Sequence, residues 1–266
     1  ISMDGTGLGD DGNIWGGEFL ICDLSSYSRF KHFEYIPLPG GDKVTKEPWR
    51  TGLSYLYQCF SEQTFDYHWP FLESTQKDHV RIMLEAIDKK INAPLSSSAG
   101  RLFDAVAAIT GVCTHAKFHA EAPMRLEAVI QPGIDDAYPF DLGEAISFRS
   151  TLDELIHDLR NGVSTGILSA RFHNTFVNVL FAMACQIRKE TRLEKVVLSG
   201  GTFQNKYILS RIEKKLAGDG FSVFAQEKIP TNDGGIALGQ LAIAAKRRSP
   251  GPGDRSEKSQ SSITNH

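Results

Sequence analysis

Three short glycine-rich segments combine residue types that bind phosphate with carboxylates that bind metal ions. They are DGTGLG at 4–9, LSGGTFQN at 198–205 and NDGGIALG at 232–239. Glycine lets backbone N–H groups approach a ligand closely, and a helix that begins after such a turn offers unpaired N–H groups to an anion. A single turn of this kind needs no ligand. Three of them in one chain, two with an aspartate attached, favour a nucleotide site.

Asp4 and Asp233 are the carboxylates attached to these turns, and each also has an ordinary structural explanation. An aspartate in a turn can bond its own backbone, which would suit Asp4. Asn232 or Asp233 could cap a helix. Beside anion-binding turns, the two carboxylates could instead hold a divalent ion that bridges to phosphates.

The histidines and cysteines give a weaker signal. His115 and His119 could share one helical face, but Pro123 interrupts their segment and no third metal ligand is near. His173 is expected to be a core histidine with satisfied hydrogen bonds. No CxxC pair is present, which favours buried free thiols in a reducing, cytoplasmic compartment. The cysteines are Cys22, Cys59, Cys113 and Cys185.

The composition indicates a globular protein with a substantial core. The chain has 266 residues, is 41% hydrophobic and carries a formal net charge of -3. This charge gives no electrostatic footprint for nucleic acid or an anionic membrane. No apolar run approaches the roughly 20 residues of a membrane-spanning helix, and no secretory signal is visible. Ile1 opens directly on a strand-like segment, which suggests a fragment or a processed chain.

The elements that must position the glycine turns alternate between strand and helix in the C-terminal half. A strand at 195–201, a helix at 202–218, a strand at 221–226 and a helix at 232–248 are expected. This order indicates an α/β unit with parallel strands. A long helix at 166–190 precedes it and is apolar except for a polar stripe at Arg171, Asn174 and Asn178, so it should be buried.

The N-terminal half begins with β structure and continues with helices. Strands are expected at 13–24 and 26–38, helices at 46–60, 74–92 and 97–112, and irregular structure at 132–150. Serines precede the helix at 97–112 and Gly111 can end it. The tail at 249–266 is rich in Pro, Gly, Ser and charge, and is expected to be disordered.

Several segments, taken together and in order from about residue 3 to 245, resemble the carbamoyltransferase HypF of nickel–iron hydrogenase maturation. They are DGTGLGDDGNIWGGEF, PLPGGD, EPWR, SSAGRLFDAVAAITGV, ARFHNT, VVLSGGTFQN and NDGGIALGQ. The resemblance implies an α/β domain over 1–248, with a helical insertion around 44–165. Its fold would be actin-like and sugar-kinase-like, with ribonuclease-H-like lobes around a nucleotide cleft, incomplete on the N-terminal side.

The resemblance also implies a reaction. That family carries carbamoyl from carbamoyl phosphate, through a carbamoyl-adenylate made with ATP, to the C-terminal cysteine of its partner HypE. The product becomes a cyanide ligand of the hydrogenase. ATP or carbamoyl-adenylate and a divalent metal (Fe, Zn or Mg) are the implied cofactors, with no nucleic acid or membrane partner.

The same resemblance assigns residues. Asp4 and Asp233 would be catalytic residues at metal-ligand positions, and Gly5, Thr6 and Gly7 would form the phosphate-side loop. The other nucleotide-binding positions would be Gly100, Arg101, Asp104, Gly200, Gly201 and Asn205.

Two departures from the family pattern stand out. The family's two histidine ligands, in an HxxxH arrangement, would lie before the first residue of this chain. The segment FHAEAP at 118–123 replaces a YEGQAA pattern, with His119 for a glutamate and Ala120 for a glycine. The expected enzyme is therefore a fragment, inactive without upstream regions. A small-molecule kinase with Asp4 as general base, or a non-catalytic remnant that binds nucleotide or partner, are the alternatives.

Overall fold

The computed structural model describes residues 1–61, 68–73 and 75–248, so the tail expected to be disordered lies outside the described residues. Its opening strands form an antiparallel meander with β2 in the middle. The parallel partner of β2 is β5, and β4 pairs with β5. These strands are β1 (Ser2–Leu8), β2 (Ile14–Cys22), β3 (Tyr27–His32), β4 (Ile36–Pro37) and β5 (Leu95–Ser96).

The C-terminal strands β8 (Lys195–Val197) and β9 (Ser222–Phe224) are parallel, as predicted. The opening strand β1 continues their pairing on the other side of β8. Met3 donates its N–H to the carbonyl of Ser199 at 2.8 Å, and Ser199 donates to the carbonyl of Ile1 at 3.0 Å. The opening strand and the segment after β8 therefore meet, which brings the first two glycine turns together.

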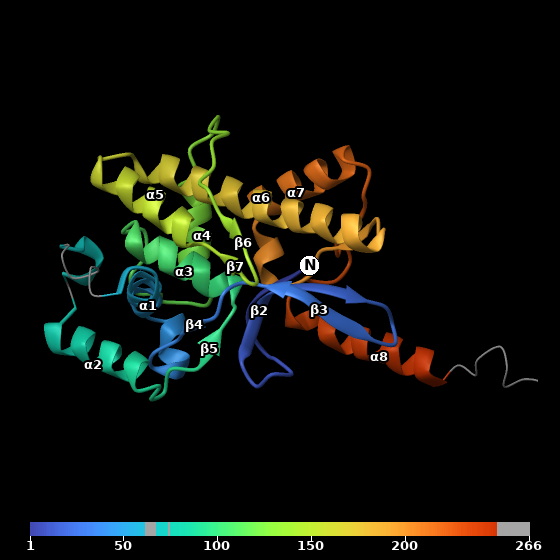
Figure 1. The fold of residues 1–266 in the computed structure, drawn as a ribbon, viewed down its shortest axis with the longest axis horizontal. Helices are drawn as coiled ribbons and strands as arrows, with labels where there is room; N and C mark the ends of the chain where they lie inside the picture. Colours follow the sequence, from blue (N-terminus) through green and yellow to red (C-terminus); the bar gives the residue numbers. More distant parts are fainter. Residues whose placement is uncertain (62–67, 74, 249–266) are drawn as a thin grey trace, which may run out of the picture.

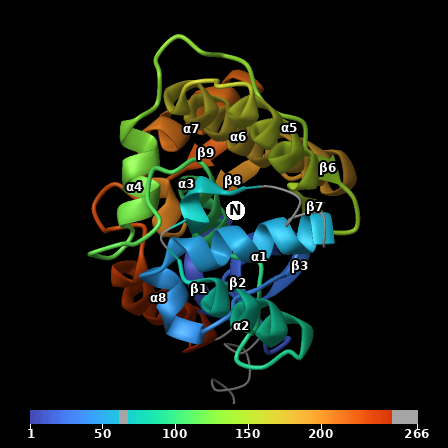
Figure 2. The same cartoon turned by 90° about the vertical axis from the view of Figure 1, so that its left-hand side faces the viewer.

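Figure 1 shows helices α6 and α7 on one side of the long strands and α8 on the other. The helices are α1 (Pro48–Phe60), α2 (Lys77–Asp88), α3 (Ala99–Ile109), α4 (Glu121–Ala128), α5 (Arg149–Arg160), α6 (Thr165–Thr191), α7 (Lys206–Gly218) and α8 (Ile236–Arg248). All helices expected from the sequence are present. Figure 2 shows α5, α6 and α7 stacked together, far from α2.

Two helices were not expected from the sequence. Pro123 interrupts no hydrogen bond, because it is the third residue of α4, where backbone N–H groups have no partner inside the helix. The start of α5 at Arg149 lies in the stretch expected to be irregular, and Leu152, Leu155 and Ile156 bury one face of it. The short strands β6 (Asp141–Leu142) and β7 (Ile146–Ser147) pair just before it.

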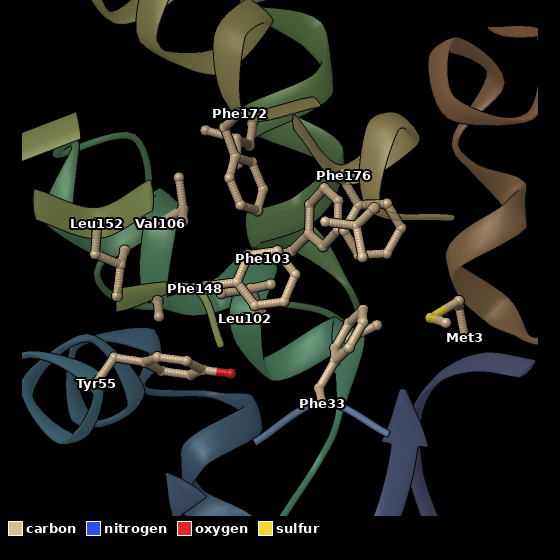
Figure 3. Close-up of a cluster of buried hydrophobic side chains, with 14 of the residues drawn as sticks. Met3, Phe33, Tyr55, Leu102, Phe103, Val106, Phe148, Leu152, Phe172 and Phe176 are labelled. Atoms are coloured by element: carbon tan, nitrogen blue, oxygen red, sulfur yellow. The ribbon is translucent and has the colours of Figure 1, made fainter. Parts of the chain in front are cut away.

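The core is an aromatic cluster around α3 (Figure 3). The ring of Phe103 meets those of Phe172 and Phe176 on α6, with centroids 4.9 and 5.0 Å apart. Phe33 packs edge-on against Phe176. Met3 is fully buried in the same core, so the residue after it in β1 faces the other way. The first glycine turn is thus anchored directly to the core.

All four cysteines are free. Cys59 and Cys113 are buried as expected, whereas Cys185 is only half-buried. Cys22 is exposed because it ends β2 at the turn to β3. None of the helices in the described part of the chain has the length and apolar character of a membrane span.

Candidate active site

The first glycine turn is a bulge in β1. Met3 pairs with Gly17 and Gly7 pairs with Trp15, so three residues of β1, 4–6, stand opposite one residue of β2. Such bulges expel residues from the strand ladder and are common beside active sites. The sequence Asp-Gly-Thr is thereby pushed out of the sheet, with Thr6 and Gly7 exposed.

The carboxylate of Asp4 joins the first glycine turn to the second. Its Oδ1 atom accepts the N–H of Gly5 at 2.7 Å and that of Gly201 at 3.4 Å. Its Oδ2 atom accepts no hydrogen bond from any described residue, although the side chain is half-buried. One carboxylate oxygen therefore organises the two turns while the other is available to a ligand.

Glycine is required where these backbones meet. Gly200 has φ +105°, and a Cβ there would lie 2.1 Å from the carbonyl oxygen of Met3. A Cβ on Gly100 would lie 3.0 Å from the Cα atom of Gly5. Any side chain at Gly200 would force β1 and the turn after β8 apart.

The N-terminus of α3 is directed at the same bulge. Ser98 caps this helix: its Oγ atom accepts the N–H of Arg101 at 3.0 Å and donates to the carbonyl of Asp4 at 3.1 Å. The first turn of a helix carries partial positive charge and unpaired N–H groups. The bulge, the second turn and this helix end together form a setting suited to an anion.

The third glycine turn is tied to the second by one backbone hydrogen bond, from the N–H of Gly200 to the carbonyl of Thr231 at 3.0 Å. Asn232 caps the following short helix by accepting the N–H of Gly234 at 3.1 Å. Asp233 is exposed and is not the cap. A single ion shared by Asp4 and Asp233 stays a prediction.

No three His, Cys, Asp or Glu side chains gather as a metal site among the described residues. Two aspartates offer a divalent ion only part of the six or more oxygen ligands that Ca²⁺ or Mg²⁺ takes. The residues present therefore do not by themselves fit a complete metal centre.

Asn205 is engaged on both ends of its amide. Its Oδ1 atom accepts the N–H of Ile208 as the cap of α7, and its Nδ2 atom faces Nε2 of His173 at 3.1 Å. Nδ1 of His173 lies 2.7 Å from the carbonyl of Ser169 and must carry the proton, since a carbonyl only accepts. Burial lowers the pKa of His173 to about 4. His173 is the satisfied core histidine that was expected, and a nucleotide contact by Asn205 stays a prediction.

Asp104 lies inside the core and not at the edge of α3. It is 2% exposed and pairs with Arg101 at 3.0 Å. Burial raises the pKa of Asp104 to about 6, and the Arg101 guanidinium opposes this rise. Helix α3 is buried nearly all round, because α1, α4 and α6 pack against it. Nucleotide contacts by Arg101 and Asp104 stay predictions.

A buried carboxylate that was not singled out in the sequence, Glu18, fixes the loop before α3. Glu18 is 2% exposed; it accepts the hydroxyl of Ser97 and Nε of Arg29, both at 2.5 Å. Ser97 precedes the cap of α3, so Glu18 fixes this loop to β2. A glutamate in the otherwise apolar strand IWGGEFLIC was the available signal.

His115 and His119 are exposed and lie in turns before α4, so the idea of two imidazoles on one helical face is wrong. Ala120 has φ +58°, in the left-handed region. This conformation accounts for a glycine in the family pattern at that position.

A cavity of about 780 Å³ lies between α6 and α7 and contains none of the predicted site residues. Its lining includes Asn178, Arg211 and Lys214.

The polar stripe of α6 has a structural role: Asn174 donates to the carbonyls of Ile134 and Asp136, each at 2.9 Å.

Comparison with known proteins identifies relatives of this chain. Residues 1–240 match the family described as the carbamoyltransferase Kae1-like domain, second subdomain. The carbamoyltransferase HypF of Rhodobacter capsulatus is 36% identical over 248 residues, which cover 93% of this chain and 32% of the relative. Carbamoyltransferase HypF2 of Cupriavidus necator is 31% identical to this chain. The aligned stretch covers 93% of this chain and 33% of that relative. The chain thus spans about a third of the length of each of these two relatives.

A solved structure with the same fold is described as full-length HypF in the phosphate- and nucleotide-bound form. It is 43% identical to this chain, with a TM-score of 0.87. The match covers 92% of this chain and 39% of the chain in that structure. This similarity confirms the α/β fold that the sequence resemblance implied.

Proposed function

The chain belongs to the HypF carbamoyltransferase family, and from that premise we propose that its joined glycine turns hold the phosphate of a carbamoyl-adenylate. The observation that carries this proposal is the meeting of three elements at Asp4. The carboxylate accepts N–H groups from Gly5 and Gly201, and Ser98 at the start of α3 donates to the Asp4 carbonyl. The similar structure described as phosphate- and nucleotide-bound supports it.

In the proposed reaction the carbamoyl group moves to the C-terminal cysteine of a HypE-like partner. The thiolate attacks the carbamoyl carbon, a C–S bond forms, and the bond from that carbon to the adenylate oxygen breaks. AMP leaves with the electron pair on its phosphate. Backbone N–H groups and the N-terminus of α3 would stabilise this charge as it develops. Carbamoyl phosphate and ATP would be consumed earlier, in making the adenylate.

The described residues of this chain would supply only some of the ligands of a divalent metal. Asp4 Oδ2 and Asp233 would supply two ligands, and the two histidines of an HxxxH motif before the first residue of this chain would complete the set. A bound metal would add positive charge at the phosphate. The free thiols support a reducing, cytoplasmic setting, and the domain is proposed to cover residues 1–248.

The proposal is tested by measuring the two half-reactions separately. This chain replaces the matched stretch of the full-length Rhodobacter capsulatus relative, and Asp233→Ala is introduced. Pyrophosphate release should be unchanged, because the adenylate is made elsewhere, while the mass of the partner's C-terminal peptide should show no carbamoyl transfer. Asp78→Ala on α2, an aspartate 81% exposed, is the matched control and should leave both steps intact.

Loss of adenylate formation in Asp233→Ala, or normal transfer by it, would contradict this division of roles. Phosphoryl transfer to an added sugar would select the kinase alternative. Nucleotide binding without either reaction would select the non-catalytic remnant.

A further inference from the structure

A second cavity, of about 370 Å³, lies where α1, α2 and the short helix Gly41–Thr45 meet. Figure 2 shows α1 and α2 side by side. The cavity shares no lining residue with the glycine turns. Three of the four residues of the EPWR segment at 47–50 line it, and the proposed function gives this segment no role. Its volume falls within the roughly 300–1,000 Å³ of small-molecule sites.

Arg50 is a nearly buried cation that borders this cavity and has hydrogen-bonding capacity left over. It is 8% exposed. Its Nε atom donates to Glu47 at 2.5 Å, whereas Nη1 donates to the thioether sulfur of Met83, a weak acceptor. Its Nη2 atom donates to no described residue. The guanidinium lies 5.1 Å from the ring centroid of Trp49 and against Gly40, where a Cβ would lie 2.5 Å from Nη1. The group is thus held in place without being fully satisfied.

Further donors line the same cavity. The hydroxyl of Thr75 is buried and has no hydrogen-bond partner in the described part of the chain. Thr75 and Gln76 immediately precede α2, and the Gln76 side chain does not cap this helix. Unpaired N–H groups and the positive end of the helix dipole therefore lie beside the cavity. Lys43, His79 and His115 also contribute to the lining.

The charges around the cavity favour an anion. Among the described residues that line it, Glu47 is the one carboxylate, and it already pairs with Arg50. Lys43 pairs with no carboxylate of the described ranges. A buried guanidinium or hydroxyl without a full set of partners costs free energy. An anion in the cavity would supply acceptors to both.

We propose that this cavity, termed the α1–α2 pocket, binds the phosphate group of a small phosphate monoester. The donors come from four segments, namely the short helix, α1, the start of α2 and the turn at His115, so they approach from several directions. Such a set suits the three acceptor oxygens of a phosphate better than a planar carboxylate. The pocket has room for more than the phosphate, and Trp49, Ile82 and Met83 offer apolar contacts to the organic part.

Glycerol 3-phosphate is the probe that tests the pocket, and its binding to the ¹⁵N-labelled chain is followed by NMR. The indole N–H of Trp49 and the amides of Thr75 and Gln76 should shift with one dissociation constant. Lys43→Gln should weaken binding about threefold or more, because an opposite charge is lost. Lys46→Gln is the matched control, since Lys46 is also exposed but does not line the pocket, and it should leave the affinity unchanged.

Thr75→Val distinguishes a hydroxyl that meets a ligand from one that is merely buried. The substitution keeps the shape of the side chain and removes an atom that has no partner in the described structure. The midpoint of thermal unfolding should therefore stay the same or rise, while the probe binds about threefold more weakly. Arg50→Lys should weaken binding about tenfold, because an ammonium lacks the planar fork of donors. If Arg50→Lys does not fold, Lys43→Gln and Thr75→Val decide.

Several results would overturn the proposal. Shifts confined to Gly5, Gly7 and Gly201 would place the phosphate at the glycine turns alone. Unchanged affinity in both Lys43→Gln and Thr75→Val would exclude the α1–α2 pocket. Malonate binding as tightly as glycerol 3-phosphate would show a carboxylate site, and equal binding of glycerol would show that the phosphate is not recognised. The pocket uses none of the residues of the proposed function, so either can fail without the other.

Discussion

At the scale of single residues, Asp4 joins two glycine turns of the candidate site through one atom of its carboxylate. One carboxylate oxygen holds the N–H groups of Gly5 and Gly201, and the other has no partner among the described residues. His173 and Ala120 each have an environment that makes a distinct, measurable contribution to stability.

The buried histidine should make stability depend on pH. The pKa of His173 is lowered to about 4, so as pH falls the unfolded chain takes up this proton first. The stability advantage of wild type over His173→Gln should be full above pH 6.5 and shrink by roughly 3 kcal/mol by pH 4. Urea unfolding at several pH values measures this difference. The titration of Asp104 is common to both proteins and cancels, so a difference that does not change with pH would contradict the assignment.

The left-handed conformation of Ala120 should carry a cost that glycine removes. Ala120→Gly should raise the free energy of unfolding by about 0.5–1 kcal/mol, because an L-residue at φ +58° is strained. Ala122→Gly is the control, because Ala122 lies inside α4 where glycine is unfavourable. This substitution should lower the free energy of unfolding by roughly 1 kcal/mol. Thermal unfolding of both variants decides this, and a destabilised Ala120→Gly would show that the side chain has a packing role.

At the scale of elements, α3 connects the core to the site. Its sides are buried against α1, α4 and α6, while its N-terminus meets the Asp4 bulge. Glu18 holds the loop before it through Ser97. The helix end is therefore fixed by core packing and by a buried carboxylate together, which gives the preorganisation that charge stabilisation requires.

Ser98, which caps α3, should contribute more to the free energy of unfolding than a serine at a helix start that makes no capping hydrogen bond. Ser98→Ala removes an acceptor for Arg101 N–H and a donor to the Asp4 carbonyl, and should cost about 1–2 kcal/mol. Ser164 occupies the same position at the start of α6 but makes no capping hydrogen bond. Ser164→Ala should therefore change the free energy of unfolding by less than about 0.5 kcal/mol. Equal losses in urea unfolding would contradict a special role for Ser98.

Local patterns predicted α3, α6 and the alternation from β8 to α8, because helical spacing and β-branched runs are visible over short windows. The apolar strand around Glu18 marked it as unusual, but its partner Ser97 could not be predicted, because Ser97 is 79 residues away. The burial of Asp104 depends on helices that cover α3 from distant parts of the sequence. Pro123 misled the assignment of α4, because its position within the first turn cannot be known before the helix start.

At the scale of the whole molecule, the opening strand β1 and the segments around Gly200 and Thr231 build one candidate site. The strand β1 pairs with the segment after β8, so the first and second glycine turns meet across almost 200 residues, and Thr231 brings the third beside them. In the described chain the three glycine turns thus lie together at one junction, and this is where we propose that the phosphate binds.

The most direct test of the central claim is a titration of the ¹⁵N-labelled chain with AMP, followed by amide NMR. We expect the amides of Gly5, Gly7 and Gly201 to shift together with one dissociation constant. Nothing lies within 4 Å of a Cβ built on Gly5 or on Gly218, so Ala should be accommodated at either position.

Gly5→Ala places its methyl group where the phosphate is proposed to bind, and should weaken AMP binding at least about tenfold, or 1.4 kcal/mol. Gly218→Ala, at the end of α7, should leave the dissociation constant unchanged. Shifts confined to the cavity between α6 and α7, around Asn178 and Lys214, or an unchanged affinity in Gly5→Ala, would contradict the claim that the glycine turns form the nucleotide site.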